Sequence, residues 1–325
     1  MMRRISIYIL PALLLLLQGC LKEHTSGCES RLLLRFRYTL NEQYSNLFGK
    51  EIHKITVYVF DAQGKYAGSF TGQGSHLTND YVMRIPLPEG RYSIIAYGGD
   101  FTAFRTVELN GQGYNNLRKG LTDISDFRTE LKYESGEENY LYPATIPDDL
   151  YAGFITGAVA SYNNEKVTEV ELIKNTKNII VRITGAAPAT LTAANTAAMP
   201  FDVYITALNG RYLADNSIDL NHGTFKYTPQ NTTVGENSMQ VELKTMRLIL
   251  GQAPRLIVRN NETTEEIYNQ NMIDQILQNP KYKTQQDIDR EDEFVFEIGI
   301  QSQNNQVQIT VSINGWKINS ITPGV

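Results

Sequence analysis

The chain has 325 residues, with 30 Lys and Arg against 35 Asp and Glu, which gives a formal net charge of −5 at pH 7. This length allows two ordinary domains, and the acidic balance argues against nucleic acid as a partner. The 19 Tyr and 12 Phe, together with many Val, Ile and Thr, favour a protein built mainly of β-strands.

The first nineteen residues are typical of a secretory signal peptide. Arg3 and Arg4 precede an apolar run, Ile5–Leu17, that is too short to span a bilayer. Gly19 and Cys20 follow, and this ending resembles the bacterial lipobox, in which the chain is cut before a cysteine that receives lipid. We expect cleavage between these two residues and acyl chains on Cys20, which would hold the protein on a membrane. The alternative is an ordinary signal peptide with a cysteine near its end.

Residues 20–30 are typical of a flexible tether, because Gly, Ser, Thr and charged residues occur there without apolar periodicity. Cys28 would be the one remaining free cysteine, so we expect no internal disulfide and a stability that depends on a packed core. Strand-like runs separated by turn residues follow the tether. In the first half of the chain they lie at 32–40, 55–61, 81–87 and 92–98.

An internal repeat indicates two related domains. Val57–Tyr66 resembles Val203–Tyr212, which lies 146 residues later, and Leu32–Phe36 resembles Ile179–Ile183 at nearly the same distance. We interpret the repeat as the duplication of one β-domain. The alternative is that two unrelated hairpins use the same common turn. With duplication, the two domains would cover residues 31–155 and 156–325.

One helix is predicted in the second domain, over Thr264–Asn279, because its apolar residues share one helical face and Pro280 follows it. That face consists of Ile267, Met272, Ile273, Ile276 and Leu277. We expect a surface helix that packs on a sheet. Further on, Val307–Asn314 alternates strictly between apolar and polar residues, which predicts a half-buried strand.

The residue types that carry chemistry do not form a recognisable catalytic or metal-binding pattern. Asp287–Glu293 is acidic enough to attract calcium but lacks the glycine and the spacing of a calcium loop, so we expect a solvated charged loop. No nucleotide-binding or hydrolase motif is present. We therefore predict no metal, no cofactor and no enzymatic activity. None of the four histidines has a second potential ligand at the sequence spacing of a metal site; they are His24, His53, His76 and His222.

Tyrosines on a sheet can stack on glycans or fill the core. Tyr58, Tyr92, Tyr97 and Tyr204 lie within strand-like runs, which favours core or cross-strand positions. A surface glycan-binding lipoprotein stays an alternative, and such a protein would show a row of exposed aromatic side chains.

Several motifs in the right order resemble one known family. After the lipobox come Val57–Tyr66 (VYVFDAQGKY), Leu87–Gly98 (LPEGRYSIIAYG) and, near the end, Val311–Trp316 (VSINGW). Together they resemble the fimbrial anchoring-subunit lipoproteins of Bacteroidales, the FimB-like family. The resemblance implies two transthyretin-like β-sandwich domains in tandem, attachment to the outer membrane at the cell surface, and a role as the base that anchors a fimbrial shaft and limits its length.

The same resemblance distinguishes an anchor from a shaft subunit. Shaft subunits of such fimbriae lose their first strand to an arginine-specific protease, whereas an anchor must keep that strand because it leads to the lipid. The loop Asn41–Lys50 contains no arginine, and Arg35 and Arg37 fall within the predicted first strand. This pattern favours an anchor. A tip or shaft subunit of the fimbria is the alternative.

An anchor that keeps its first strand would contribute a strand to its partner, because no groove opens in it. We expect the C-terminal region, Val307–Val325, to contact the fimbrial shaft subunit. Pro323 would interrupt a long ladder of hydrogen bonds there. The predicted apolar contacts are Ile318, Ile321 and Val325.

Overall fold

The computed structural model describes residues 30–109, 114–185, 201–235, 237–303 and 306–321. It confirms a mainly β chain in which the strands form tandem β-sandwiches and the helices are few and short. The predicted signal peptide and tether lie outside the described residues, and so do Gly19, Cys20, His24 and Cys28.

In the first half, a three-stranded sheet faces a five-stranded one. The three strands are, in spatial order, β12 (Val167–Glu171), β1 (Arg31–Arg37) and β4 (Val82–Pro86). The five strands are β13 (Ile173–Lys174), β11 (Tyr151–Ala160), β5 (Gly90–Gly98), β2 (Lys54–Phe60) and β3 (Tyr66–Gln73). One apolar core joins both sheets and includes Leu34, Phe36, Val57 and Ile94. The strands predicted from the first four apolar runs are confirmed.

In the second half, two six-stranded sheets enclose the larger core. The first consists of β18 (Asn231–Val234), β19 (Ser238–Met246), β14 (Thr176–Thr184), β22 (Glu293–Gln303), β23 (Gln306–Ile313) and β24 (Trp316–Ile321). The second consists of β21 (Glu266–Asn271), β20 (Arg255–Asn260), β15 (Phe201–Ala207), β17 (Phe225–Tyr227), β10 (Leu141–Pro143) and β9 (Tyr133–Ser135). The half-buried strand expected at 307–314 is β23, in which Ile309, Val311 and Ile313 face the core.

The two halves share one pattern of strand pairing. β1 runs parallel to β12 and antiparallel to β4, and β14 likewise runs parallel to β22 and antiparallel to β19. In the opposite sheets, β2 lies between β3 and β5, just as β15 lies between β17 and β20. The strand segments that repeat in the sequence therefore occupy equivalent positions, which supports the interpretation as a duplication.

The chain passes from one half to the other near residue 175, which is later than the expected border at 155/156. That border falls inside β11, which pairs with β5 on both sides of it. At Thr156-Gly157 the strand has a β-bulge, in which Gly157 has a φ of 72°. β11 and β12 are both needed to complete the first half, because each supplies a strand to one of its two sheets.

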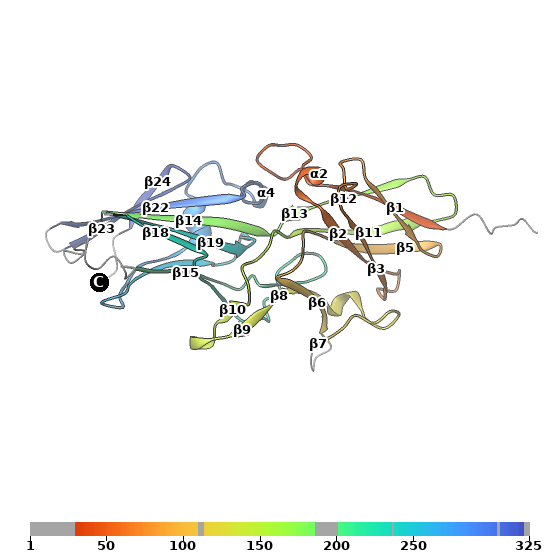
Figure 1. Cartoon of the computed structure of the whole chain (residues 1–325), viewed down its shortest axis with the longest axis horizontal. Helices are drawn as coiled ribbons and strands as arrows, with labels where there is room; N and C mark the ends of the chain where they lie inside the picture. The colour runs from red at the N-terminus through yellow and green to blue at the C-terminus, as the bar shows by residue number, and fades with distance from the viewer. Residues whose placement is uncertain (1–29, 110–113, 186–200, 236, 304–305, 322–325) are drawn as a thin grey trace, which may run out of the picture.

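A long excursion between β5 and β11 links the halves. It forms β6 (Phe104–Leu109), β7 (Tyr114–Asn115) and β8 (Phe127–Leu131), which make a four-stranded sheet with β16 (Arg211–Tyr212) from the second half. β10 then pairs with β17. In Figure 1 this excursion lies below the two sandwiches, between them. The larger core accordingly contains side chains of both halves, such as Phe127 and Tyr212.

The helix predicted over 264–279 is wrong in its first part. Glu266–Asn271 is β21, a strand that pairs with β20, and only Met272–Ile276 forms a helix, α3. Strand pairing prevails because β20 would otherwise expose its backbone groups along that edge. The side chain of Asn271 accepts a hydrogen bond from the N–H of Ile273 and so begins the helix. Ile273 and Ile276 are buried, as the expected contact with a sheet requires.

The prediction of a solvated charged loop at 287–293 is also wrong. Gln285–Arg290 is a short helix, α4, which begins with a capping box between Thr284 and Asp287. Asp289 and Glu291 are 1% and 3% exposed. Each of the two buried carboxylates pairs with a basic side chain: Asp289 with Arg247 and Glu291 with Lys281. Among the described residues, the other α-helix is α2 (Phe48–Glu51), and two 3-10 helices cover Ile124–Asp126 and Glu137–Asn139.

Candidate functional site

The first strand is held in the middle of its sheet. β1 is hydrogen-bonded to β12 on one side and to β4 on the other, and Leu32, Leu34 and Phe36 are fully buried. Arg35 and Arg37 lie within the strand, as predicted. The guanidinium of Arg37 forms ion pairs of 3.4 Å with Glu169 and 3.4 Å with Glu171 of the parallel neighbour. Because β1 has two partner strands, its removal would break two ladders at once.

The loop after β1 is fixed by side chains. Asn41 donates hydrogen bonds from Nδ2 to the carbonyls of Tyr38 and Ser45, both at 2.8 Å. Arg290 of α4 donates from Nη1 to the carbonyls of Thr39 at 3.2 Å and Asn41 at 3.3 Å. The same guanidinium lies 4.3 Å from the ring centre of Tyr44. The arginine-free loop is thus attached to the second half.

Close to this loop, a chain of alternating charges crosses from one half to the other. Lys174 Nζ lies 3.1 Å from Asp149 and 3.5 Å from Asp292, and Lys244 Nζ lies 2.7 Å from Asp149. The hydroxyl of Tyr38 donates to Asp292 at 3.3 Å. Burial tends to raise the pKa of Asp149, but the two lysines outweigh it and hold that pKa below its usual value. Asp149 is therefore an anion paired with two lysines.

A second group of buried charges lies under α4. Arg247 donates from Nε and Nη2 to the two carboxylate oxygens of Asp289, at 2.7 and 2.6 Å. Lys177 is buried beside them and donates from Nζ to the carbonyl of Asp289 at 2.7 Å and to that of Glu291. Burial lowers the pKa of Lys177 to about 8. Each charge in this group has a partner, which makes its role one of holding α4 in place.

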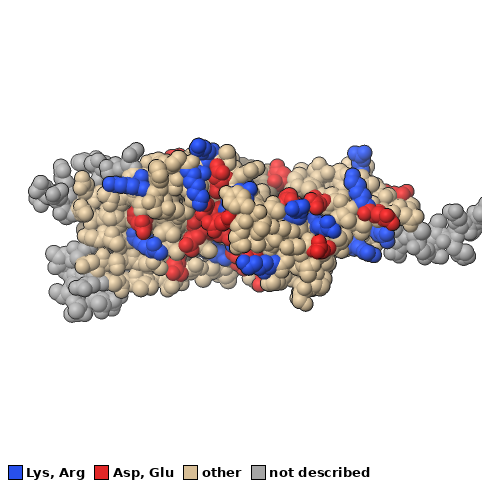
Figure 2. Space-filling view, turned by 90° about the horizontal axis from the view of Figure 1, so that it is seen from above, with Lys and Arg blue, Asp and Glu red and all other residues tan. Residues whose placement is uncertain are grey.

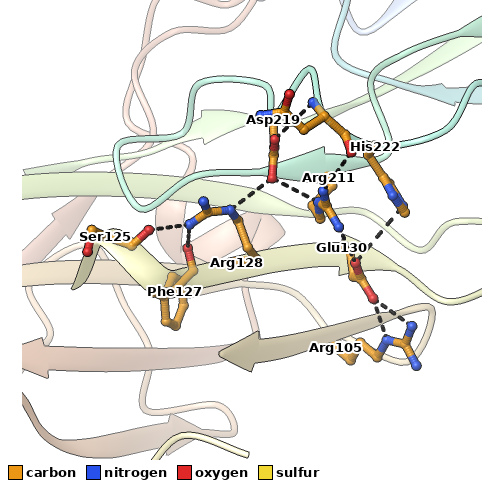
Figure 3. A network of polar contacts seen from close by, with 9 residues as sticks. Arg105, Ser125, Phe127, Arg128, Glu130, Arg211, Asp219 and His222 are labelled. Atoms are coloured by element: carbon orange, nitrogen blue, oxygen red, sulfur yellow. Dashed lines mark hydrogen bonds and ion pairs between the residues drawn. The ribbon is translucent and has the colours of Figure 1, made fainter. Parts of the chain in front are cut away.

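A third network joins β6 and β8 of the excursion to the second half (Figure 3). Glu130 is fully buried and accepts a 2.7 Å hydrogen bond from Arg105 Nε, while Arg211 Nη1 lies 3.8 Å away. Arg211 Nε lies 3.0 Å from Asp219, which also accepts a hydrogen bond of 2.9 Å from Arg128. Two buried carboxylates and three guanidiniums thus form a charge network between the halves.

His222 borders this network, with Nε2 at 4.0 Å from Glu130. Burial, together with the charge of Arg211, lowers its pKa to about 4, so the ring is neutral at pH 7. Burial also raises the pKa of Glu130, despite the charges of Arg105 and Arg211. Within the described ranges no cluster of metal ligands is found. The network is suited to joining two parts of a protein.

In the described part of the chain, the C-terminal strand β24 is the edge of its sheet and pairs with β23 alone. Ile318 is 2% exposed and belongs to the core, whereas Trp316 is 46% exposed. The side chain of Ile321 and all of Val325 lie outside the described residues, so the contact assigned to these three apolar residues stays a prediction. β1 begins at one end of the long axis and β24 ends towards the other (Figure 1).

Aromatic side chains do not form an exposed row in the described part of the chain. Tyr92, Tyr97 and Tyr204 are buried, which confirms their core or cross-strand positions, and Tyr58 packs against the ring of Phe127. The exposed aromatic residues lie on three separate segments: Tyr44, Tyr162 and Trp316. A cavity of about 370 Å³ lies beside the end of β15, with Leu208, Ile249 and Pro254 in its wall.

Comparisons with known proteins agree with this arrangement. A family model described as fimbrillin-A associated anchor proteins Mfa1 and Mfa2 matches residues 25–322. The chain belongs to this family. The family is one of anchor proteins and not of enzymes, and it places this member among fimbria-associated proteins of the cell envelope. Within the described residues of this family member, no helix is long and apolar enough to cross a membrane.

Solved structures show the same fold. The fimbrial anchor protein Mfa2 from Porphyromonas gingivalis is 17% identical to this family member, with a TM-score of 0.70 over 90% of this chain and 100% of that chain. A protein from Bacteroides thetaiotaomicron that is proposed to bind polysaccharide is 23% identical, with a TM-score of 0.73 over 91% and 99%. A proposed adhesin from the same species is 26% identical, with a TM-score of 0.71 over 90% and 98%. Among curated proteins, none matches this chain.

Proposed function

We propose that the protein is a lipoprotein that is cut before Cys20, is held on the outer membrane at the cell surface by acyl chains on that residue, and anchors the base of a fimbria. Membership of an anchor family and the lipobox support this proposal. The single observation that carries it is the position of β1, which is enclosed between two strands and followed by an arginine-free loop attached to α4. A strand that leads to the lipid must resist removal.

The attachment to the membrane is tested on the protein isolated from cells that bear surface fibres. Mass spectrometry of its N-terminal peptide should find acylated Cys20, and the chain should remain intact through the loop after β1. An unmodified N-terminus, or a chain cut between residues 35 and 54, would contradict the anchor and favour a shaft or tip subunit. An acylated chain that copurifies with no fibre protein and binds polysaccharide on a glycan array would favour the alternative of a glycan-binding lipoprotein.

The fimbrial shaft subunit is the proposed partner, and strand addition at the C-terminal region is the proposed mode of contact. β24 supports this mode because it is a sheet edge whose outer backbone groups have no strand partner in the described part of the sheet. Since Ile318 is buried within its own sheet, the contact would use the free edge of β24 together with the residues after it. An anchor that occupies the base in this way would also limit the length of the shaft.

Deleting Asn319–Val325 tests the shaft contact. The truncated protein should remain folded and on the membrane, while fimbriae should no longer be attached to the cells and should collect in the medium. Leu220→Ser is the matched control, because Leu220 is an exposed apolar residue outside this region and its loss should leave attachment unchanged. Normal fimbriation of the truncated strain, counted by electron microscopy, would show that the C-terminal region is not the contact.

A further inference from the structure

The end of the molecule at which β1 begins carries a small exposed surface made of the turn between β11 and β12 and the strand ends beside it. Tyr162 is 55% exposed on this turn, and Val159 at the end of β11 is 45% exposed. Val159 lies opposite Arg91 across the sheet, and the exposed Lys166 closes the turn. We refer to Arg31, Arg91, Val159, Tyr162 and Lys166 as the proximal surface.

Hydrogen bonds join the proximal surface to the start of β1. Arg31 and Ser161 exchange two backbone hydrogen bonds, of 3.2 and 3.3 Å. Asn164 donates from Nδ2 to the carbonyls of Arg31 and Val159, at 3.1 and 3.0 Å. The N–H of Tyr162 donates to Glu89 of the neighbouring turn at 3.3 Å. The exposed aromatic ring thus projects from a fixed turn, directly beside the point where the described chain begins.

The distance to the lipid is short. The ten residues between Cys20 and Arg31 span at most about 35 Å when fully extended. A tether of this length keeps the proximal surface at a high effective concentration near the bilayer, so even a weak contact with the membrane would be populated. Tyrosine, with an apolar ring and a polar hydroxyl, is favoured at the boundary between headgroups and acyl chains, and Arg and Lys accompany it there.

The local charge also favours a contact of this end with the membrane. Three basic residues, Arg31, Arg91 and Lys166, lie at this end together with two acidic ones, Glu89 and Glu165, whereas the whole chain carries a net charge of −5. Figure 2 shows Lys and Arg side chains together with Asp and Glu at this end of the molecule. An acidic protein is repelled by an anionic lipid surface along most of its length, and a basic end reverses this repulsion locally.

We infer that the proximal surface is a membrane-seating surface that places Tyr162 and Val159 among the headgroups of the bilayer and directs the long axis of the molecule away from it. The inference rests on the proposed lipid at Cys20, and it adds a defined orientation to that attachment. With the tether alone, the protein could lie along the membrane. With the proximal surface seated, β24 points outward, where a shaft could extend from it (Figure 1).

The single tryptophan of the chain makes the test direct. The full lipidated chain is reconstituted in vesicles of phosphatidylethanolamine and phosphatidylglycerol in which a part of the acyl chains is brominated, since bromine quenches tryptophan that reaches the bilayer. Three proteins are compared: the wild type, which reports on Trp316; the double variant Tyr162→Trp/Trp316→Phe; and the matched control Leu220→Trp/Trp316→Phe. Leu220, at 56% exposed, is as accessible as Tyr162 but lies on the second half.

If the proximal surface contacts the bilayer, the fluorescence of tryptophan at position 162 should shift to the blue and be quenched. Neither change is expected for tryptophan at 220 or 316. Adding Arg91→Gln and Lys166→Gln to the first variant should weaken the quenching. Equal quenching at all three positions, or none at 162, would overturn the orientation. Loss of the quenching on addition of inorganic phosphate would show a phosphate site in place of a membrane surface and would also overturn it. A chain that does not float with the vesicles would instead overturn the lipid anchor, and the inference with it.

Discussion

The two halves of the molecule share a pairing pattern but differ in what is built around it. β1 is the middle of a sheet of three strands, whereas its counterpart β14 belongs to a sheet of six that continues through β23 to the edge strand β24. The first half, in turn, contains the excursion that forms β6 to β10 and docks on the second. The shared strands form the framework of each half. The features that differ are the excursion, which joins the two halves, and β24, which leaves a free sheet edge at the surface.

The largest effect is expected at the charge network between the halves. Arg211→Met would leave Glu130 and Asp219 buried without their shared cation, and we expect unfolding to become easier by about 3–5 kcal/mol. Arg182→Met is the matched control, since the Arg182–Glu297 pair at 3.6 Å is half exposed and should contribute less than about 1 kcal/mol. Urea unfolding measures both. Equal, small effects would mean that this network does not hold the halves together.

Equivalent substitutions in the two central strands sharpen the comparison. Leu32 in β1 and Ile179 in β14 are both fully buried and lie at matching places of the repeat. Leu32→Ala and Ile179→Ala should each lower the free energy of unfolding by about 2–5 kcal/mol, because each leaves a cavity in a closed core. Thermal unfolding is the measurement. If Leu32→Ala had little effect, the first strand would be as dispensable as in a shaft subunit, and the anchor would lose its main support.

Acid should loosen the joint between the halves before it affects either half. The folded pKa of His222 is about 4, below the ordinary 6.5, so the unfolded state binds more protons between these values. Stability that is present above pH 6.5 is lost as the pH falls, by about 2–3 kcal/mol at pH 4. His222→Gln should flatten this slope, while His53→Gln, at an exposed position, should leave it unchanged. Identical slopes in all three proteins would assign the acid sensitivity elsewhere.

The smallest effect is expected at α4, which is specific to the second half. Thr284→Ala removes the side chain that caps the helix and should cost about 1 kcal/mol. Because Arg290 at the end of α4 holds the loop after β1, proteolysis of that loop should also become faster. Limited digestion with an enzyme that cuts after lysine reports on Lys50, which lies in α2 at the end of this loop. Thr263→Ala, outside the helix, is the control, and equal digestion rates would separate α4 from the protection of the loop.

Local patterns in the sequence were enough for most strands and for the repeat. Alternation predicts β23 because one face of it is buried and the other is not. The same approach fails at Glu266–Asn271, where helical spacing of apolar residues is overruled by a neighbouring strand edge. It also fails at the predicted border 155/156, which lies inside β11 beside a β-bulge. Both outcomes depend on partners that are distant in the sequence.

The buried charges are the part of the candidate site that could not be predicted from the sequence. Arg211 aligns with Lys65 in the repeat, and each pairs with an aspartate, Asp219 and Asp123 respectively. The repeat could have suggested a basic residue at a fixed structural position, but not that one pair would be buried and the other half exposed. Burial follows from the docked excursion, which the composition of residues 99–150 does not indicate. By contrast, the first strand and its arginine-free loop were visible in the sequence because they depend on local residue types.

The parallel pairing of β1 with β12 also determines when this protein can fold. Arg37 and its partner Glu169 are 132 residues apart, so the first strand finds no parallel neighbour until more than half of the chain is available. The excursion must likewise wait for β16 and β17. Contacts of such high sequence separation make folding slow, because a long loop must close before they form. A chain that emerges gradually from an export channel would thus stay open until late, which suits a protein that is proposed to cross one membrane before settling on another.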